Sequence, residues 1–244
     1  MKGHITMDFK RGIKDGIPIA LGYFSVSIAF GLMAAEAGCT WFEAMLISIT
    51  NLTSAGQFAG VTVLAHMGSY LEMALTQLVI NSRYALMGIS LSQKVDKKFK
   101  GIWRLLLGYA ITDEIFAVAI GQKGELSRSY YAGLFSIPVI GWTSGTVVGA
   151  VLGNIMPLII TNALGVALYG MFIAVVVPAA RENLKVLSVV IVTIIISSAL
   201  YYIPAFDGIS AGFAIIICAV VASAIGAAMF PIPDENTETV KEVE

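Results

Sequence analysis

Long apolar runs separated by short polar stretches recur along the whole chain. The runs cover residues 17–37, 40–67, 68–92, 102–121, 130–153, 155–180, 186–203 and 209–230. Most of them approach or exceed the roughly 20 residues that an α-helix needs to cross a bilayer. A helix satisfies its own backbone hydrogen bonds, which the bilayer core cannot do. The pattern therefore predicts an all-α polytopic membrane protein with about 6–8 hydrophobic helical segments.

Two of these runs, residues 40–67 and 130–153, are interrupted by polar and helix-breaking residues. In the first run these are Asn51, Thr53, Ser54, Gly56, Gln57 and Gly60, and in the second they are Pro138, Gly141, Thr143, Ser144 and Gly145. Irregular backbone at membrane depth is tolerated where it is buried in protein or lines a cavity, and broken helices often form binding sites in membrane proteins. The alternative is a kinked helix whose serine and threonine side chains bond to its own carbonyls.

Short echoes in the sequence indicate two internal repeats, residues 17–92 and 103–180. The tripeptide LGY at residues 21–23 recurs at 107–109, TSAG at 53–56 is echoed by TSG at 143–145, and ALMG at 85–88 is echoed by ALYG at 167–170. Each repeat is predicted to contain a helix, a broken segment and a second helix. Two C-terminal helices, residues 186–203 and 209–230, complete a single transmembrane domain over residues 1–230.

Composition agrees with a membrane protein. Of the 244 residues, 57% are hydrophobic and 13% are charged, whereas a soluble domain normally carries about 25% charged residues. The polar, acidic residues 231–244 are predicted to form a disordered tail. Two cysteines and two histidines give a metal site few ligands, and no cofactor is predicted. The sequence shows no histidine cluster and no serine beside a general base, so an enzyme is not expected.

Two basic stretches set the expected orientation. They are the N-terminal arm, residues 1–16, and the segment KVDKKFK at residues 94–100. Because cytoplasmic loops are enriched in lysine and arginine, both stretches and the N-terminus are predicted to be cytoplasmic. Each repeat then crosses the membrane an even number of times, so that the broken segments are re-entrant and the repeats are parallel. If the broken segments cross fully, the repeats are inverted and one basic stretch lies outside.

One charged residue lies deep within an apolar run. Arg83 is roughly eleven residues, or about 16 Å of helix, from Lys94 at the end of its run. An arginine at that depth costs roughly 2.5–3.5 kcal/mol on insertion scales, so it needs a partner. Asp113 and Glu114, at the centre of the next run, are the predicted partners. These charges predict a site in the middle of the membrane.

The segments TSAGQFAG at residues 53–60, NSRYALMGISLS at 81–92 and TDEIFA at 112–117 resemble the AzlC-type family of branched-chain amino acid permeases. The resemblance implies transport of branched-chain or related small amino acids, most often export. It also implies that the chain is the large subunit of a two-component permease, with a small AzlD-type membrane protein as its partner. The implied location is the bacterial inner membrane.

An amino acid is a zwitterion, so a site in the membrane must offer a cation, an anion and an apolar pocket. Arg83 is predicted to hold the carboxylate, and Asp113 or Glu114 to hold the ammonium group or carry a proton. The broken backbone at residues 53–56 would offer free N–H groups to the carboxylate. The predicted substrate-binding residues are Arg83, Asp113, Glu114, Asn81, Tyr84, Gln57, Thr53, Ser54 and Gly56.

Three alternatives remain open from the sequence. Arg83 and Asp113 could form an ion pair that only fixes two helices. The chain could be a channel, or a transporter for another small solute. It could also be an assembly or sensor subunit that does not transport.

Overall fold

The computed structural model describes residues 2–153, 159, 166, 170, 173 and 176–231, with side chains described from residue 8 onward. The chain forms two compact units, Met1–Phe172 and Ile173–Glu244. Most of the run at residues 155–180 lies outside the described residues, including the echo at 167–170 except for Gly170, as does the predicted tail apart from its first residue. That the units form one transmembrane domain stays a prediction.

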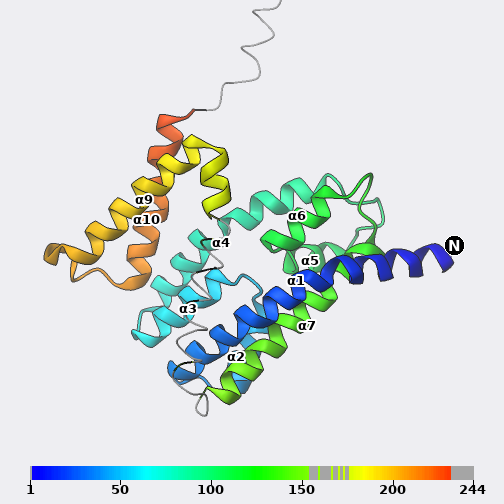
Figure 1. Cartoon of the computed structure of the whole chain (residues 1–244), viewed down its shortest axis with the longest axis horizontal. Coiled ribbons are helices and arrows are strands. Elements are labelled where there is room, and N and C mark those ends of the chain that lie inside the picture. The colour runs from blue at the N-terminus through cyan, green and yellow to red at the C-terminus, as the bar shows by residue number, and fades with distance from the viewer. Residues whose placement is uncertain are drawn as a thin grey trace, which may run out of the picture. The chain divides into compact units, whose positions relative to one another are not determined.

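Unit 1 is built from helices of very different length (Figure 1). Those given by its described residues are α1 (Lys2–Glu36), α2 (Trp41–Thr50), α3 (Ala55–Ala65), α4 (Tyr70–Ser92), α5 (Ile102–Tyr109), α6 (Asp113–Gly121) and α7 (Arg128–Leu152). The prediction of an all-helical chain is confirmed for the part of the chain that the structure describes, in which the only β-type pairing is an isolated bridge between Val95 and Leu126.

In the described part of unit 2, two apolar helices pack on one another, α9 (Leu184–Tyr202) and α10 (Ala211–Met229). A short 3-10 turn, η1 (Pro204–Phe206), lies in their connection. These helices confirm the two predicted C-terminal segments. Four described helices are long and apolar enough to cross a membrane, namely α1 over Asp8–Glu36, α7, α9 and α10.

Helices α1 and α7 run parallel and in backbone contact. A Cβ atom at Gly12 would overlap the carbonyl oxygen of Tyr130, and one at Gly149 would overlap that of Ile28. Small residues allow such close approach, which is the main source of helix association in membranes. The predicted break in residues 130–153 is therefore wrong, because α7 is continuous and its glycines serve packing. The predicted equivalence of the two repeats is not shown.

The two predicted basic stretches lie at the same end of unit 1. The Leu126 N–H donates to the carbonyl of Lys94 (2.8 Å), which places the loop after α4 beside the loop before α7. The Arg11 guanidinium donates to the Gln122 side chain (2.8 Å), which adds the start of α1. We call this the basic end, and it contains residues 10–14, 93–101 and 122–127.

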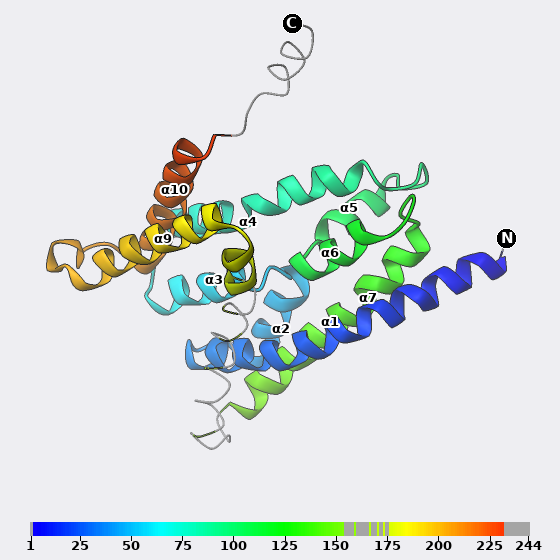
Figure 2. The same cartoon turned by 45° about the horizontal axis from the view of Figure 1, so that its top comes forward.

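The contacts at the basic end determine how the shorter helices run. Because α4 ends there, α4 begins at the opposite end, where α1 also ends. The segment α2–α3 joins these two points, so it enters from the opposite end and returns to it as a hairpin with its tip at residues 51–54. The segment α5–α6 starts and finishes at the basic end, so it is a second hairpin, with its tip at residues 110–112. Figures 1 and 2 show both hairpins between the longer helices.

The prediction of one helix over residues 102–121 is therefore wrong. The chain turns because Thr112 starts a new helix there: its hydroxyl accepts the Ile115 N–H (3.3 Å). Asp113 and Glu114 occupy the first turn of α6, where the positive end of the helix dipole stabilises negative charge.

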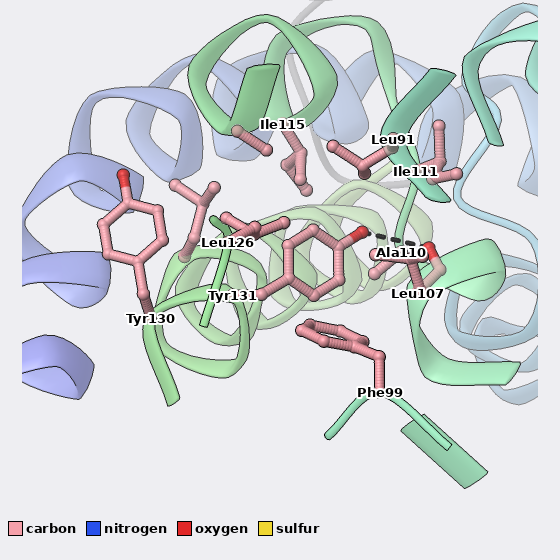
Figure 3. Packing of buried hydrophobic residues seen from close by; sticks show 11 residues of the cluster. Leu91, Phe99, Leu107, Ala110, Ile111, Ile115, Leu126, Tyr130 and Tyr131 are labelled. Atoms are coloured by element: carbon pink, nitrogen blue, oxygen red, sulfur yellow. Dashed lines mark hydrogen bonds between the residues drawn. The ribbon is translucent and has the colours of Figure 1, made fainter. Parts of the chain in front are cut away.

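Two apolar clusters hold the hairpins. At the basic end, Tyr131 of α7 is fully buried against Phe99 and Leu126, and its hydroxyl donates to the carbonyl of Leu107 (3.0 Å) (Figure 3). Towards the opposite end, Trp142 of α7 packs with residues of α1, α2 and α3. Each hairpin is thereby anchored on α7, which fixes the positions of the two tips.

Candidate functional site

An ion pair joins α4 to the tip of the second hairpin. Arg83 Nη1 lies 2.9 Å from Asp113 Oδ2, and Asp113 is the first residue of α6. The side chains are 42% and 35% exposed, so both charges remain accessible within unit 1. The acidic partner that the sequence predicted for Arg83 is thus Asp113, while a role of the pair in substrate binding stays a prediction.

Tyr84 links this ion pair to the tip of the first hairpin. The Arg83 guanidinium lies 5.0 Å from the centre of the Tyr84 ring and donates to its hydroxyl from Nη2 (3.2 Å). The same hydroxyl donates to the carbonyl of Thr53 (3.4 Å). A cation over an aromatic face is held electrostatically. Tyr84 therefore places the Arg83 charge beside the break between α2 and α3.

The start of α3 leaves polar atoms unsatisfied. Ser54 occupies the N-cap position with a φ of +45°, and its side chain forms no capping bond. Among the described residues, Thr53 Oγ1, Ser54 Oγ, Asn81 Oδ1 and Arg83 Nε are buried atoms without a hydrogen-bond partner. Buried polar atoms normally find a partner, so four such atoms beside one helix terminus require an explanation.

Gly56 lies at the centre of this group. A Cβ atom there would come within 3.0 Å of Asn81 Oδ1 and would overlap Thr53 Oγ1. Gln77 of α4 donates from Nε2 to the carbonyl of Gly56 (2.7 Å), and its Oε1 accepts from Asn81 (3.0 Å). Helix α4 therefore approaches the first turn of α3 closely because residue 56 has no side chain.

Glu114 lies apart from Arg83 and contacts α1 instead. The Tyr23 hydroxyl lies between Glu114 Oε2, to which it is hydrogen-bonded, and Thr112 Oγ1 (2.6 Å). Because phenol and threonine hydroxyls both donate and accept, this chain of bonds can run in either direction. It links the first turn of α6 to α1. Tyr23 is not among the predicted site residues. Two features of the sequence pointed to it: it is the only tyrosine in the apolar run at residues 17–37, and it belongs to the LGY tripeptide that recurs at 107–109.

Gln57 also points away from the ion pair. Its side chain is 1% exposed, accepts from Trp142 Nε1 (2.8 Å) and donates to Ser48 Oγ (3.0 Å), which in turn bonds Thr146 (2.7 Å). This buried network ties both arms of the first hairpin to α7. The predicted site residues that gather around the break are Arg83, Asp113, Tyr84, Asn81, Thr53, Ser54 and Gly56, whereas Glu114 and the Gln57 amide lie outside this group.

Comparison with known proteins places these helices in a family. The family model described as AzlC protein matches residues 18–156, a stretch that contains every candidate site residue. The Escherichia coli (strain K12) inner membrane protein YgaZ is 31% identical over 150 residues, which cover 60% of this chain and 61% of YgaZ. An uncharacterized membrane protein of Archaeoglobus fulgidus is 28% identical over 179 residues, covering 72% of this chain and 76% of that protein.

A more distant relative carries a functional name. The Bacillus subtilis (strain 168) branched-chain amino acid transport protein AzlC is 20% identical over 158 residues, covering 63% of this chain and 61% of that protein. The alignments thus span about three fifths of the length of YgaZ and of AzlC. No solved structure matches the chain. Because the family model covers more than half of the sequence, the chain belongs to the AzlC family of membrane proteins.

Proposed function

We propose that this chain transports branched-chain or related small amino acids, in the direction of export, as the large subunit of a two-component permease. Family membership and the name of the Bacillus subtilis relative support the substrate class. The observation that carries the proposal is the group of unpartnered polar atoms at the start of α3, next to the Arg83–Asp113 ion pair.

The chemistry of these atoms suits a zwitterion. Arg83 Nε and the hydroxyls of Thr53 and Ser54 can donate to a carboxylate, and the start of α3 adds the positive end of a helix dipole. Asn81 Oδ1 and the Asp113 carboxylate can accept from an ammonium group. Each charged end of an amino acid would therefore replace a missing partner. An ion pair with a structural role alone would leave the four atoms unexplained.

The second acid is proposed to carry a proton. Glu114 does not pair with Arg83, and its bond to Tyr23 lies on the side of α6 that faces α1. A carboxyl that gains or loses a proton needs neighbours that can reverse their hydrogen bonds, which the hydroxyls of Tyr23 and Thr112 can do. Proton movement at Glu114 would then accompany substrate movement at Asp113, its neighbour in the first turn of α6, and at Arg83 of α4.

The proposed setting is the bacterial inner membrane, with a small AzlD-type membrane protein as partner. Four described helices could span a bilayer, and YgaZ is named an inner membrane protein. A cytoplasmic N-terminus is supported by the gathering of both basic stretches at one end of unit 1. The two tips would then lie between the membrane surfaces, each hairpin entering from a different side.

Export from intact bacteria tests this proposal. Cells are loaded with valine- or leucine-containing dipeptides, and free amino acid is followed inside and outside. They carry this chain alone, this chain with its partner, or Arg83→Gln with the partner, and membrane insertion is verified for each. Faster efflux only with the intact pair is the expected result. Equal efflux in all cells would contradict the proposal and favour a channel, another solute or an assembly subunit.

A further inference from the structure

A cavity of about 200 Å³ lies beside the first turns of α3. It is bounded by α2, α3 and α4, three elements of unit 1. Its apolar walls are formed by the side chains of Ile47, Val61, Leu64 and Met73. The backbone of α3 lines it at Gly56 and Gly60. Pockets for drug-sized ligands usually exceed about 300 Å³. This cavity therefore suits a smaller apolar group.

Three polar side chains line the cavity, those of Asn51, Gln57 and Gln77, and the two glutamines are already engaged with protein groups. Gln57 bonds Trp142 and Ser48, and Gln77 bonds the Gly56 carbonyl and Asn81. Their amides are thereby held in place, and a ligand group gains little by hydrogen bonding to them. Apart from Asn51, the cavity therefore offers a ligand mainly apolar surface and a limited volume rather than free polar groups.

Gly56 connects the cavity to the unpartnered polar atoms. It lines the cavity, and it also lies next to Thr53 Oγ1 and Asn81 Oδ1. A ligand whose charged groups occupy the start of α3 would therefore have its remaining carbon atoms next to the cavity. An α-amino acid has this form, since both charged groups and the side chain leave from one carbon atom.

We propose that this cavity receives the aliphatic side chain of the transported amino acid, and that Gly60 and Met73 limit its size. The inference rests on the proposed function, and it deepens that function by assigning the residues that discriminate between substrates. A Cβ atom at Gly60 would lie 3.1 Å from Gln77 Nε2 and 3.5 Å from Met73 Sδ. An added methyl group therefore takes up cavity space and displaces the Gln77 amide by a few tenths of an ångström.

Competition binding to the purified full chain, with its partner if the pair co-purifies, tests this assignment. Displacement of labelled leucine by leucine, valine and alanine is compared in wild type, Gly60→Ala and Met73→Ala. One methylene in an apolar pocket changes discrimination about 10–200-fold. Gly60→Ala should lower the leucine-to-alanine affinity ratio by about 10-fold. Met73→Ala, which enlarges the cavity, should admit a larger side chain such as that of phenylalanine.

Two matched controls add a methyl group or shorten an apolar side chain elsewhere. Gly22→Ala adds a methyl group where no atom lies within 4 Å, and Leu78→Ala shortens a side chain that is 67% exposed. Both controls should keep the wild-type ratio. A ratio unchanged in Gly60→Ala and Met73→Ala, in a protein that still binds leucine, would overturn the cavity assignment alone. Wild type that binds no amino acid would overturn the proposed function itself.

If a variant loses binding of every amino acid, its affinity ratio cannot be measured. A labelling experiment then tests directly whether the ligand occupies the cavity. The two native cysteines, Cys39 and Cys218, are replaced by serine, and Met73→Cys is added. Leucine should slow maleimide labelling at position 73, and alanine should slow it less, since its side chain does not fill the cavity. The same experiment with Leu78→Cys provides the control. Equal labelling at position 73 with and without leucine would overturn the assignment.

Discussion

The two hairpin tips look alike in outline and differ in how their helices begin. At the start of α6, Thr112 is 3% exposed, caps the Ile115 N–H and contacts the Tyr23 hydroxyl. At the start of α3, Ser54 has a φ of +45° and caps nothing within the described chain. One break is satisfied by its own side chains, and the other leaves polar atoms without partners.

This difference indicates which break is built for a ligand. An unsatisfied buried polar group costs about 1–3 kcal/mol, and the group at α3 contains four such atoms from two segments of the chain. A ligand that supplies the missing partners recovers part of that cost on binding. The start of α6 offers no comparable gain, so its role is to hold Asp113 and Glu114 in place.

The largest effect is expected from Arg83→Gln. Hydrogen bonds to charged groups are worth about 1.5–3 kcal/mol, so losing the contact to a carboxylate should reduce amino acid transport about 10–100-fold. Arg104→Gln, in the first turn of α5, removes an arginine that bonds the Phe99 carbonyl and serves as the control. Normal efflux from Arg83→Gln cells with verified insertion would argue against a binding role.

Glu114→Gln should separate coupling from binding. Glutamine preserves a bond to Tyr23 but cannot release a proton. Exchange of internal for external leucine in proteoliposomes should therefore continue, within about 2–3-fold of wild type, while net transport driven by a proton gradient should be lost. Glu36→Gln alters an exposed carboxyl at the end of α1 and should retain both activities. If Glu114→Gln retained proton-driven transport, the proton would be carried by another group and the prediction would be wrong.

Alanine substitutions at the two N-cap positions should rank differently in stability and in leucine binding. Thr112→Ala removes a capping bond worth about 1 kcal/mol and should lower thermal stability in detergent. Ser54→Ala removes a buried hydroxyl that forms no capping bond and has no hydrogen-bond partner, so stability should stay unchanged or rise, by up to about 1–3 kcal/mol. Leucine binding should fall more in Ser54→Ala than in Thr112→Ala. The same ranking in both measurements would contradict the proposed difference between the tips.

The smallest effect is expected from Ser54→Gly. A serine in this backbone conformation is strained by about 1–3 kcal/mol, whereas glycine adopts positive φ freely but loses more entropy on folding. The two terms nearly offset, so Ser54→Gly should be more stable than Ser54→Ala by about 1 kcal/mol or less. The thermal unfolding of Ser54→Gly, compared with that of Ser54→Ala, which keeps the backbone strain, measures this difference. A loss of stability would show that the strain is not located at residue 54.

The sequence predicted the part of the site that depends on charge. Arg83 in an apolar helix requires an acidic partner, and the next run carries Asp113 within reach. The first break was predictable because polar residues and glycine gather at residues 51–57. Positions of this kind follow from local composition and from the cost of burying charge.

Other features depended on tertiary structure. The glycines of α7 were interpreted as a break, but a glycine serves equally well where helices touch, and the approach of α1 decides between the two. The break before α6 was missed because Thr112-Asp113-Glu114 was interpreted as polar residues inside a helix, although the same residues are typical of a helix start. The contact of Tyr23 with Glu114 joins residues 91 positions apart, which no local pattern predicts.

Amide hydrogen exchange of the unmodified protein tests the central claim most directly. Exchange is followed in peptides that cover the first turns of α3 (residues 55–58) and α6 (residues 113–116), with and without leucine. The account predicts that leucine slows exchange in the α3 peptide and leaves the α6 peptide unchanged, because the ligand supplies partners only where the helix start lacks them. Protection confined to α6, or absent from both peptides while leucine is bound, would contradict it.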